Sequence, residues 1–283
     1  MTVYLNGAFV PEEAAKVSVF DRGFLLGDGL FETLRVHAGR LVLWPAHADR
    51  LERGAAMLRL KLPETTDRLE AAAVELLRRD RLDNAVVRIT VSRGPGPRGY
   101  SIRGADRPTW VIAAHPAPTF ENEAPVVWRL RTSRLRLPAG DPVGAHKTTS
   151  KLLHVLARAE AEEGGADEAL LLDTNGHVAE TSSANVFWFE GKEVRTPSLE
   201  AGCLAGVTRE FVMERLRSTG WEVREVLATP DRLRRADGMF LTLSSLGIVE
   251  VAALDDAALA RDPRIATVRD LYRDAVRRSI AGQ

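Results

Sequence analysis

Residues 146–188 read HKTTSKLLHVLARAEAEEGGADEALLLDTNGHVAETSSANVFW, and this stretch decides the fold. Its segment SKLLHVLARAEAEEGG predicts a helix that ends at two glycines, which are favoured where helices stop. Short runs rich in strand-forming residues follow in EALLLD, HVAETS and ANVFW. We therefore expect one helix and then a dense set of strands, as in a mixed α/β lobe. On the helix, Leu152, Val155 and Leu156 are expected to face inward.

The sequence before this stretch predicts a smaller α/β lobe. Asn6-Gly7 in VYLNGAFV and Ala38-Gly39 in LFETLRVHAGRLVLW separate apolar runs, as hairpin turns do. Helical spacing follows in PAHADRLERGAAMLRL and TTDRLEAAAVELLRRDRL. The segment PAPTFENEAP is rich in proline and acid and lacks apolar periodicity. The predicted organisation is an N-terminal α/β lobe at 1–117, an interlobe linker at 118–125 and a larger C-terminal α/β lobe at 126–283.

The composition is that of an ordinary folded protein and argues against several classes of site and partner. The formal net charge is zero, whereas nucleic-acid binders and electrostatic membrane binders need a basic excess. Cys203 is the single cysteine, which predicts a buried thiol and a reducing compartment. The six histidines show no metal-ligand spacing, and we assign no metal. The N-terminal MTVYLNGAFV lacks the features of a signal peptide, which makes the cytoplasm the expected location.

Lysine is scarce in this chain, and two lysines lie in the central stretch. Only five of the 39 basic residues are lysines, and Lys147 and Lys151 are two of them. A primary amine can condense with a carbonyl group, which arginine cannot do. Lys147 follows a loop rich in proline and glycine and precedes the predicted helix, so its side chain can project into a cleft. Lys151 lies one turn later and is expected to be a solvated surface charge.

A lysine that condenses with the aldehyde of pyridoxal phosphate requires two further groups elsewhere in the chain. One is a carboxylate for the pyridine nitrogen, and the other is an anion-binding site for the phosphate. Glu180 is the candidate carboxylate, although an exposed acid at a strand end fits the pattern as well. The candidate phosphate site is the helix start at Val207 and Thr208 behind Gly206, where unpaired N–H groups favour an anion. Plain helix capping by Thr208 is compatible with this interpretation.

Nearly the whole chain resembles the class IV aminotransferase family, the fold-type IV pyridoxal phosphate enzymes. The matching segments are LNGAFV, VFDRGFLLGDGLFETLRV, HADRL, SRGPGPRGYS, the central stretch and TPSLEAGCLAGVTRE. The family includes branched-chain and D-amino-acid transaminases and aminodeoxychorismate lyase. The resemblance implies a small N-terminal α/β lobe, a larger barrel-like α/β lobe, a cofactor between them and a homodimer that completes each site. It also implies a small, amino-acid-like substrate.

The resemblance assigns roles to individual residues. Lys147 matches the lysine that forms a Schiff base with the cofactor, and Glu180 matches the acid that pairs with the pyridine nitrogen. Arg50 in HADRL matches the arginine that binds the phosphate, although by itself it reads as an ordinary charge on an amphipathic helix. Further cofactor contacts are implied for Leu204, Val207, Thr208 and Ser244, and substrate contacts for Phe31, Arg98, Tyr100 and Ser245.

The sequence indicates the reaction type less directly than the cofactor. The loop RGPGPRGYS favours 4-amino-4-deoxychorismate lyase, which releases pyruvate and forms p-aminobenzoate. A transaminase of D-amino acids or branched-chain amino acids is the alternative. Arg98 is followed by Tyr100 where D-amino-acid enzymes have a histidine, but Leu246 stands where lyases usually have an arginine, so the departures point both ways. A dimeric binding protein without catalysis is a third class, and the joint presence of all three main cofactor residues argues against it.

Overall fold

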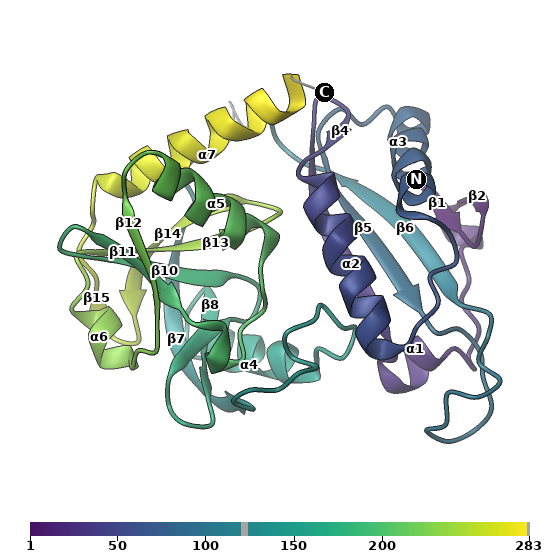
Figure 1. Cartoon of the computed structure of the whole chain (residues 1–283), viewed down its shortest axis with the longest axis horizontal. Coiled ribbons are helices and arrows are strands. Elements are labelled where there is room, and N and C mark those ends of the chain that lie inside the picture. The colour runs from purple at the N-terminus through teal and green to yellow at the C-terminus, as the bar shows by residue number, and fades with distance from the viewer. Residues whose placement is uncertain (120–123, 282–283) are drawn as a thin grey trace. The chain divides into compact units, whose positions relative to one another are not determined.

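A computed structural model of the chain describes residues 1–119 and 124–281 (Figure 1). The chain divides into two compact units, Met1–Glu123 with His146–Lys151 and Ala124–Ala145 with Leu152–Gln283. Residues 146–151 belong with the first unit, although they follow the predicted linker in the sequence. Residues 120–123 of that linker lie outside the described residues, and the predicted boundaries at 118–125 stay a prediction.

The first unit is built on one antiparallel sheet. Its strands are β1 (Thr2–Leu5), β2 (Ala8–Pro11), β3 (Gly29–His37), β4 (Arg40–Leu41), β5 (Ala85–Ser92) and β6 (Thr109–Pro116). They lie in the order β2-β1-β6-β5-β3-β4. Both predicted hairpins are confirmed, because Asn6-Gly7 joins β1 to β2 and Ala38-Gly39 joins β3 to β4, each with positive φ at both turn residues. Such turns match the twist of the flanking strands.

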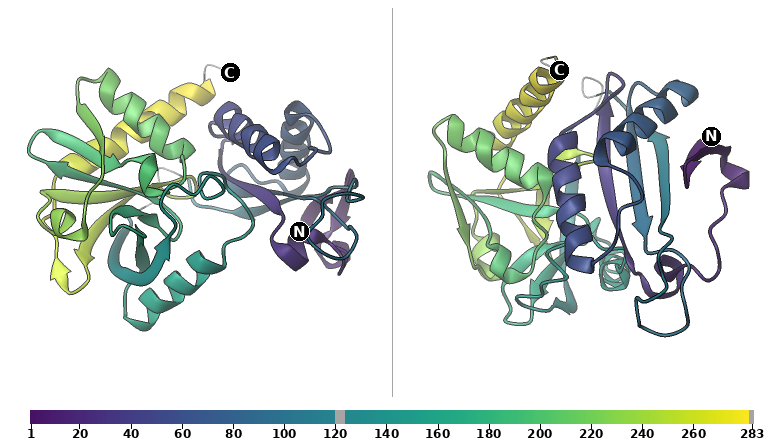
Figure 2. Two further views of the ribbon diagram at one scale, coloured as in Figure 1. Left: turned by 60° about the horizontal axis from the view of Figure 1, so that its bottom comes forward. Right: turned by 45° about the vertical axis from the view of Figure 1, so that its right-hand side comes forward.

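Helices cover one face of this sheet, as two further views show (Figure 2). They are α2 (Trp44–Leu58) and α3 (Thr66–Asp80), while the short α1 (Arg22–Leu26) precedes β3 and a single 3-10 turn, η1, spans Glu12–Ala14. The core lies between helices and sheet and includes Leu34 and Ile89 from the strands and Leu51 and Leu76 from the helices. The two helices predicted from apolar spacing are confirmed, and α2 has proline in its first turn.

The second unit contains the larger sheet, which is curled into a half-barrel. Its strands are β7 (Val127–Leu137), β8 (Glu168–Asp173), β9 (Val178–Thr181), β10 (Asn185–Glu190), β11 (Glu193–Pro197), β12 (Glu222–Val226), β13 (Gly238–Leu243), β14 (Gly247–Leu254) and β15 (Ala257–Ala258). The order is β12-β11-β10-β13-β14-β7-β8-β9, with β15 paired to β14. The pairs β11 with β12, β14 with β7 and β7 with β8 are parallel, so the sheet is mixed.

Helices of the second unit are α4 (Leu152–Glu163), α5 (Val207–Ser218), α6 (Pro230–Arg234) and α7 (Arg264–Ala281), and the 3-10 turn η2 spans Leu199–Ala201. The helix expected in the central stretch is α4, and the three strands after it are β8, β9 and β10. The expected orientation of α4 is wrong. Leu152, Val155 and Leu156 are exposed, and the helix buries the small residues Ala157 and Ala161 instead. Small side chains let the helix approach the sheet closely, and larger ones are left outside.

Candidate functional site

The Lys147 segment is held against the first strand of the site, β3. The Phe31 N–H donates to the Lys147 carbonyl at 3.0 Å, and the Thr149 N–H donates to the Gly29 carbonyl at 2.9 Å. An antiparallel bridge joins Leu30 to Thr148 between these two bonds. Because both bonds are made, the backbone of residues 147–149 has a fixed register on β3.

The Lys147 side chain is half-buried and lies over an aromatic ring. Its Nζ is 4.6 Å from the centroid of the Phe31 ring, and the Arg88 Cζ is 3.8 Å from the same centroid. Phe31 itself is buried. Two cations therefore share one ring, which attracts both through its negative face. Burial lowers the pKa of Arg88 from its ordinary value, which reflects the cost of holding that charge beside the sheet.

Arg88 was not among the site residues predicted from the sequence. In AVVRITV, Arg88 lies between Val87 and Ile89, which are fully buried in the core. Side chains alternate across a strand, so Arg88 must lie on the face opposite the core. This alternation was the available signal. The alternation does not predict which strand lies beside Arg88. In the structure Arg88 pairs with Thr33 of β3, which places it next to Phe31 on that face.

Arg50 is fixed by a buried carboxylate on β3. Glu32 accepts from the Arg50 Nε at 2.9 Å and from an Arg50 Nη at 2.6 Å, and both residues are buried. His47, one turn earlier on α2, has its Nδ1 2.7 Å from the same carboxylate. Burial by itself would raise the pKa of Glu32, but the hydrogen bonds from His47 and Arg50 outweigh it and lower the pKa to about 2.

His47 is held in its neutral form. Burial lowers the pKa of His47, against an opposing effect from the hydrogen bond to Glu32, and the charges of Arg50 and Lys147 lower it further. Because Glu32 is ionised and can only accept, the proton of neutral His47 must be on Nδ1. Neither His47 nor Glu32 was among the candidates from the sequence, since each gains its meaning from contact with Arg50 across the helix-sheet interface.

In the second unit, Glu180 is a buried acceptor for two donors. It lies on β9, where it pairs with Leu171 of β8. Its Oε2 accepts from the Leu204 backbone N–H at 3.0 Å, and its Oε1 is 3.3 Å from the His154 Nε2 of α4. The exposed position at a strand end that the sequence left open for Glu180 is wrong, because the residue is 7% exposed.

The start of α5 gathers polar groups. Val207 and Thr208 form its first turn, and the Thr208 Oγ is 3.3 Å from the Ser244 Oγ at the end of β13. The capping residue is Gly206, which provides no side-chain bond to the first N–H groups. Unpaired N–H groups and the positive end of the helix dipole favour an anion at such a point.

Asn185 supports this turn and was also missed in the sequence. Its Nδ2 donates to the Leu204 carbonyl at 2.9 Å, and its Oδ1 would lie 1.9 Å from a Cβ added to Gly206. Glycine at 206 is therefore required for close approach of the helix start to Asn185. One amide side chain thus joins the residue that donates to Glu180 with the helix start near Thr208.

The structure brings together some predicted site residues and leaves others apart. Lys147 and Phe31 are in contact in the first unit, and the second unit joins Glu180 with Leu204 and Thr208 with Ser244. Ser245 is half-buried beside Ser244. Two predicted substrate residues lie instead on the exposed loop between β5 and β6. They are Arg98 and Tyr100.

Further observations concern the metal site, the surface lysine, the buried thiol and the membrane segment that were considered from the sequence. Within the described ranges, no group of three or more potential metal ligands is close enough to hold an ion. Lys151 is half-buried, which departs from the solvated position expected for it. Cys203 is buried as predicted, and burial raises the pKa of its thiol to about 12. Among the helices described, none combines the length and apolar character needed to cross a membrane.

Comparisons with known proteins agree with this geometry. Residues 29–254 match the family model of amino-transferase class IV. A protein of Methanocaldococcus jannaschii, provisionally named a branched-chain-amino-acid aminotransferase, is 37% identical over 90% of this chain and 88% of its own length. The aminodeoxychorismate lyase of Vibrio harveyi is 32% identical, over 84% of this chain and 87% of its own. The crystal structure of the branched-chain aminotransferase from Thermoproteus uzoniensis with norvaline superposes with a TM-score of 0.91 at 29% identity, covering 98% and 94% of the two chains.

Proposed function

The chain belongs to the class IV aminotransferase family, and we propose that within this family it is a transaminase that acts on branched-chain amino acids. The predicted α/β fold type and the predicted enzyme class are confirmed by the family match and the superposition. Class IV aminotransferases use pyridoxal phosphate, as expected from the sequence.

The residues present fit this cofactor. A buried carboxylate, a helix start without a side-chain cap, two hydroxyl groups and a lysine with a fixed backbone are the groups that the cofactor requires. We propose that Lys147 is the attachment residue, that Glu180 pairs with the pyridine nitrogen and that Arg50 binds the phosphate. Leu204 would contact the ring, and Val207, Thr208 and Ser244 would bind the phosphate.

When bound, the cofactor supplies an electron sink that stabilises the carbanion formed at the substrate Cα. The chain's own residues perform the remaining tasks. The Lys147 Nζ would be the base that takes the Cα proton. Glu180 holds a positive charge at the ring nitrogen, and the Leu204 N–H and His154 fix the orientation of its carboxylate. Arg88, beside Phe31, offers a cation to a substrate carboxylate.

Leu246 is the observation that favours a transaminase over a lyase. In lyases this position usually holds an arginine, which is suited to a second carboxylate of the substrate. Leu246 packs against the apolar core of the second unit with Leu243. A side chain engaged in the core presents no charge to a substrate, and branched-chain substrates carry none in their side chains. We therefore place transamination before lyase activity, which reverses the order favoured by the loop sequence.

Aminodeoxychorismate lyase is kept as the second candidate because of the loop between β5 and β6. RGPGPRGYS is similar to the lyase loop, and relatives named as lyases are 30% and 32% identical to this chain. Arg98 and Tyr100 of this loop, together with Phe31 and Ser245, would contact the substrate in either activity. The test below separates the two activities by their products.

We also propose that the protein is a homodimer. Exposed apolar side chains gather on two elements that the rest of the described chain leaves uncovered, and such patches mark association sites. One set is Leu152, Val155 and Leu156 of α4. The other set, around α1, is Val19, Phe20, Phe24, Leu25 and Leu26. A cytoplasmic location stays a prediction.

The decisive experiment measures cofactor attachment and amino transfer in the same samples. Protein purified with pyridoxal phosphate is compared with Lys147→Ala and with Lys151→Ala, a matched control four residues further along the chain. We expect the absorption band of the attached cofactor in the wild type and the control, and its absence in Lys147→Ala. A branched-chain amino acid should bleach the band and release one keto acid per site. Pyruvate and p-aminobenzoate from aminodeoxychorismate, without bleaching by amino acids, would establish the lyase instead.

A further inference from the structure

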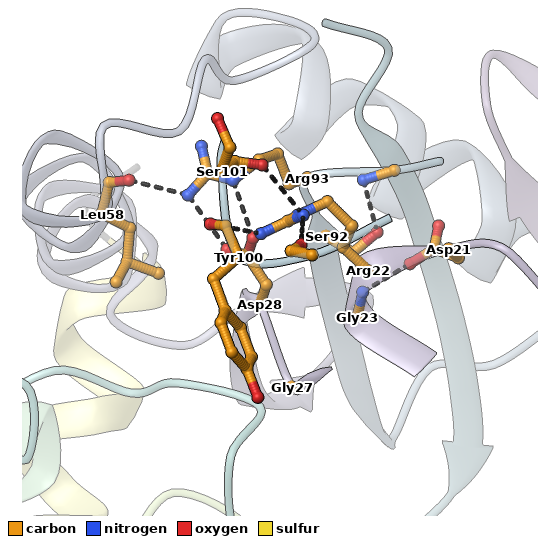
Figure 3. Close-up of polar contacts among 12 residues, drawn as sticks. Asp21, Arg22, Gly23, Gly27, Asp28, Leu58, Ser92, Arg93, Tyr100 and Ser101 are labelled. Carbon is orange, nitrogen blue, oxygen red and sulfur yellow. Dashed lines mark hydrogen bonds and ion pairs between the residues drawn. The ribbon is translucent and has the colours of Figure 1, made fainter. Parts of the chain in front are cut away.

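The loop between β5 and β6 has an exposed surface but a tightly held backbone (Figure 3). Residues 97–104 are all exposed, and Tyr100 is 89% exposed. In Figure 3 the Tyr100 ring points away from the polar network while its carbonyl points into it. An exposed loop without regular structure is ordinarily mobile. The backbone of this loop is instead held by hydrogen bonds from a buried, charged side chain.

Arg22, in the first turn of α1, is the centre of that network. One Nη donates to the Gly99 carbonyl at 2.9 Å and to the Ser101 carbonyl at 3.1 Å, and the other donates to the Tyr100 carbonyl at 3.3 Å. Its Nε donates to Asp28 at 2.8 Å. Three consecutive carbonyls thus converge on one buried guanidinium. Only the planar, five-donor arginine side chain can make this set of bonds.

Asp28 forms ion pairs with Arg22 and with a second buried arginine, Arg93. The Arg93 Nε and one Nη donate to the two Asp28 oxygens at 2.8 and 2.9 Å. Arg93 also donates to the Leu58 and Arg59 carbonyls, which end α2. Burial acts to raise the pKa of Asp28, but the hydrogen bonds from Arg93 and Arg22 outweigh it and lower the pKa. Asp28 is therefore ionised and holds both cations in place.

The path of the loop is built to fit this arrangement. Gly94 has φ +77°, and a Cβ there would lie 1.7 Å from the Arg107 carbonyl oxygen. At Gly96, a Cβ would lie 3.1 Å from the Arg22 Cδ and 2.8 Å from the Ala105 Cβ. Both glycines are needed because the loop returns close to its own base and packs on the Arg22 side chain.

The same network is continuous with the backbone that fixes Lys147. Asp28 immediately precedes β3, and its carbonyl accepts from the Arg93 N–H at 3.0 Å. The next residue, Gly29, pairs with Ser92 of β5 and accepts from the Thr149 N–H. A shift of Asp28 would therefore move the start of the strand against which the Lys147 segment lies.

We propose that Arg22 and Asp28 are positioning residues that hold the segment Arg98–Ser101 in the conformation that contacts the substrate. The claim that the loop contacts the substrate rests on the proposed function. The claim that Arg22 and Asp28 hold the loop in place does not. Arg22 and Asp28 act through the loop backbone and do not touch the reacting groups.

The test compares Arg22→Lys, Asp28→Asn and a control, Arg40→Gln, which removes an exposed arginine from β4 of the same unit. Arg22→Lys keeps the positive charge beside Asp28, so the unit stays folded, but an ammonium cannot reach Asp28 and three carbonyls together. Each holoenzyme is digested briefly with trypsin, and cleavage after Arg98 and Arg103 is measured by mass spectrometry. KM and kcat for the amino donor and the cofactor absorption band are measured on the same samples.

We expect Arg22→Lys and Asp28→Asn to raise the rate of loop cleavage roughly tenfold or more, because cleavage follows the population of the open loop. KM should rise about tenfold while kcat changes little, and the absorption band should be unchanged. Arg40→Gln should match the wild type in every measurement. Wild-type cleavage rates in Arg22→Lys would overturn the proposal, and so would faster cleavage without a rise in KM. If the wild type transfers no amino group, the proposed function fails, and the cleavage rates alone decide whether the loop is held as proposed.

Discussion

Replacement of Glu32 by glutamine tests whether the buried carboxylate stabilises the protein and orients Arg50. Glutamine keeps the shape but has one acceptor oxygen where Glu32 accepts three hydrogen bonds, two from Arg50 and one from His47. The difference between the ordinary pKa of 4.5 and the value of about 2 in the folded protein corresponds to about 3 kcal/mol at neutral pH. We expect Glu32→Gln to lower the free energy of unfolding by about that amount and to weaken cofactor binding roughly tenfold.

The pH dependence of this effect follows from the direction of the pKa shift. Because the pKa of Glu32 is lower in the folded state, the unfolded chain binds more protons as the pH falls from 4.5 toward 2. The stabilisation is fully present above pH 4.5 and is lost across that window. His47 acts in the same direction, because its lowered pKa means that the unfolded chain takes up a proton first as the pH falls below 6.5. The gap between wild type and Glu32→Gln should narrow as the pH falls from 4.5 toward 2, because Glu32 itself becomes protonated there.

Glu75 is a matched control because its pKa is also lowered to about 2, by hydrogen bonds from Arg78 and Arg79. Those groups lie on the exposed face of α3, where solvent screens the interaction. Urea unfolding of the cofactor-free protein is followed by tryptophan fluorescence, to which the buried core residues Trp44 and Trp110 contribute. Glu75→Gln should leave the free energy of unfolding nearly unchanged. Equal losses in the two variants, or a Glu32→Gln loss that is the same at pH 7 and pH 3, would refute the reasoning.

Three further predictions concern the helix start, the α2 terminus and the dimer. Gly206→Ala should lower the free energy of unfolding by about 2 kcal/mol and weaken phosphate binding, because the added Cβ would meet Asn185. Gly144→Ala is the control and should be tolerated. Urea unfolding measures the stability of both variants, and cofactor titration measures their phosphate binding. Arg93→Gln removes the donors to the Leu58 and Arg59 carbonyls and two bonds to Asp28, so urea unfolding should show a loss of about 3 kcal/mol. Leu156→Asp, on the exposed face of α4, should convert the dimer to monomers in sedimentation velocity, and an unchanged sedimentation coefficient would place the interface elsewhere.

Local patterns in the sequence were sufficient for most of the secondary structure. Asn6-Gly7 and Ala38-Gly39 predict hairpins because few residues adopt positive φ, and the spacing of apolar residues predicts α2 and α3. The face of α4 could not be predicted in the same way. Its apolar periodicity was correct, but only Ala157 and Ala161 are fully buried and Leu153 packs beside them, while Leu152, Val155 and Leu156 remain exposed. Periodicity shows that a helix has an apolar side without showing what covers it.

The residues that support the site were hidden because their partners are distant in the sequence. Asn185 contacts Leu204 across 19 positions, and Arg22 contacts the loop carbonyls across more than 70. Nothing local distinguishes Arg22 from the many other arginines of the chain. Reasoning from the residues identified Lys147 and Glu180, and the family resemblance added Arg50, but neither identified the side chains that hold them.

Strand β3 shows why register matters for this site. Phe31 and Glu32 are consecutive, so their side chains lie on opposite faces of the sheet. Phe31 contacts Lys147 on the face away from the core, while Glu32 binds Arg50 of α2 on the helix-covered face. A slip of one residue would exchange the two faces and separate both pairs at once. Gly29 sets this register at the strand's start, because a Cβ there would lie 2.7 Å from the Val91 carbonyl oxygen and 3.2 Å from the Thr149 Oγ. The pairing of β3 with β5 and with residues 147–149 is therefore a requirement of the proposed chemistry as well as of the fold.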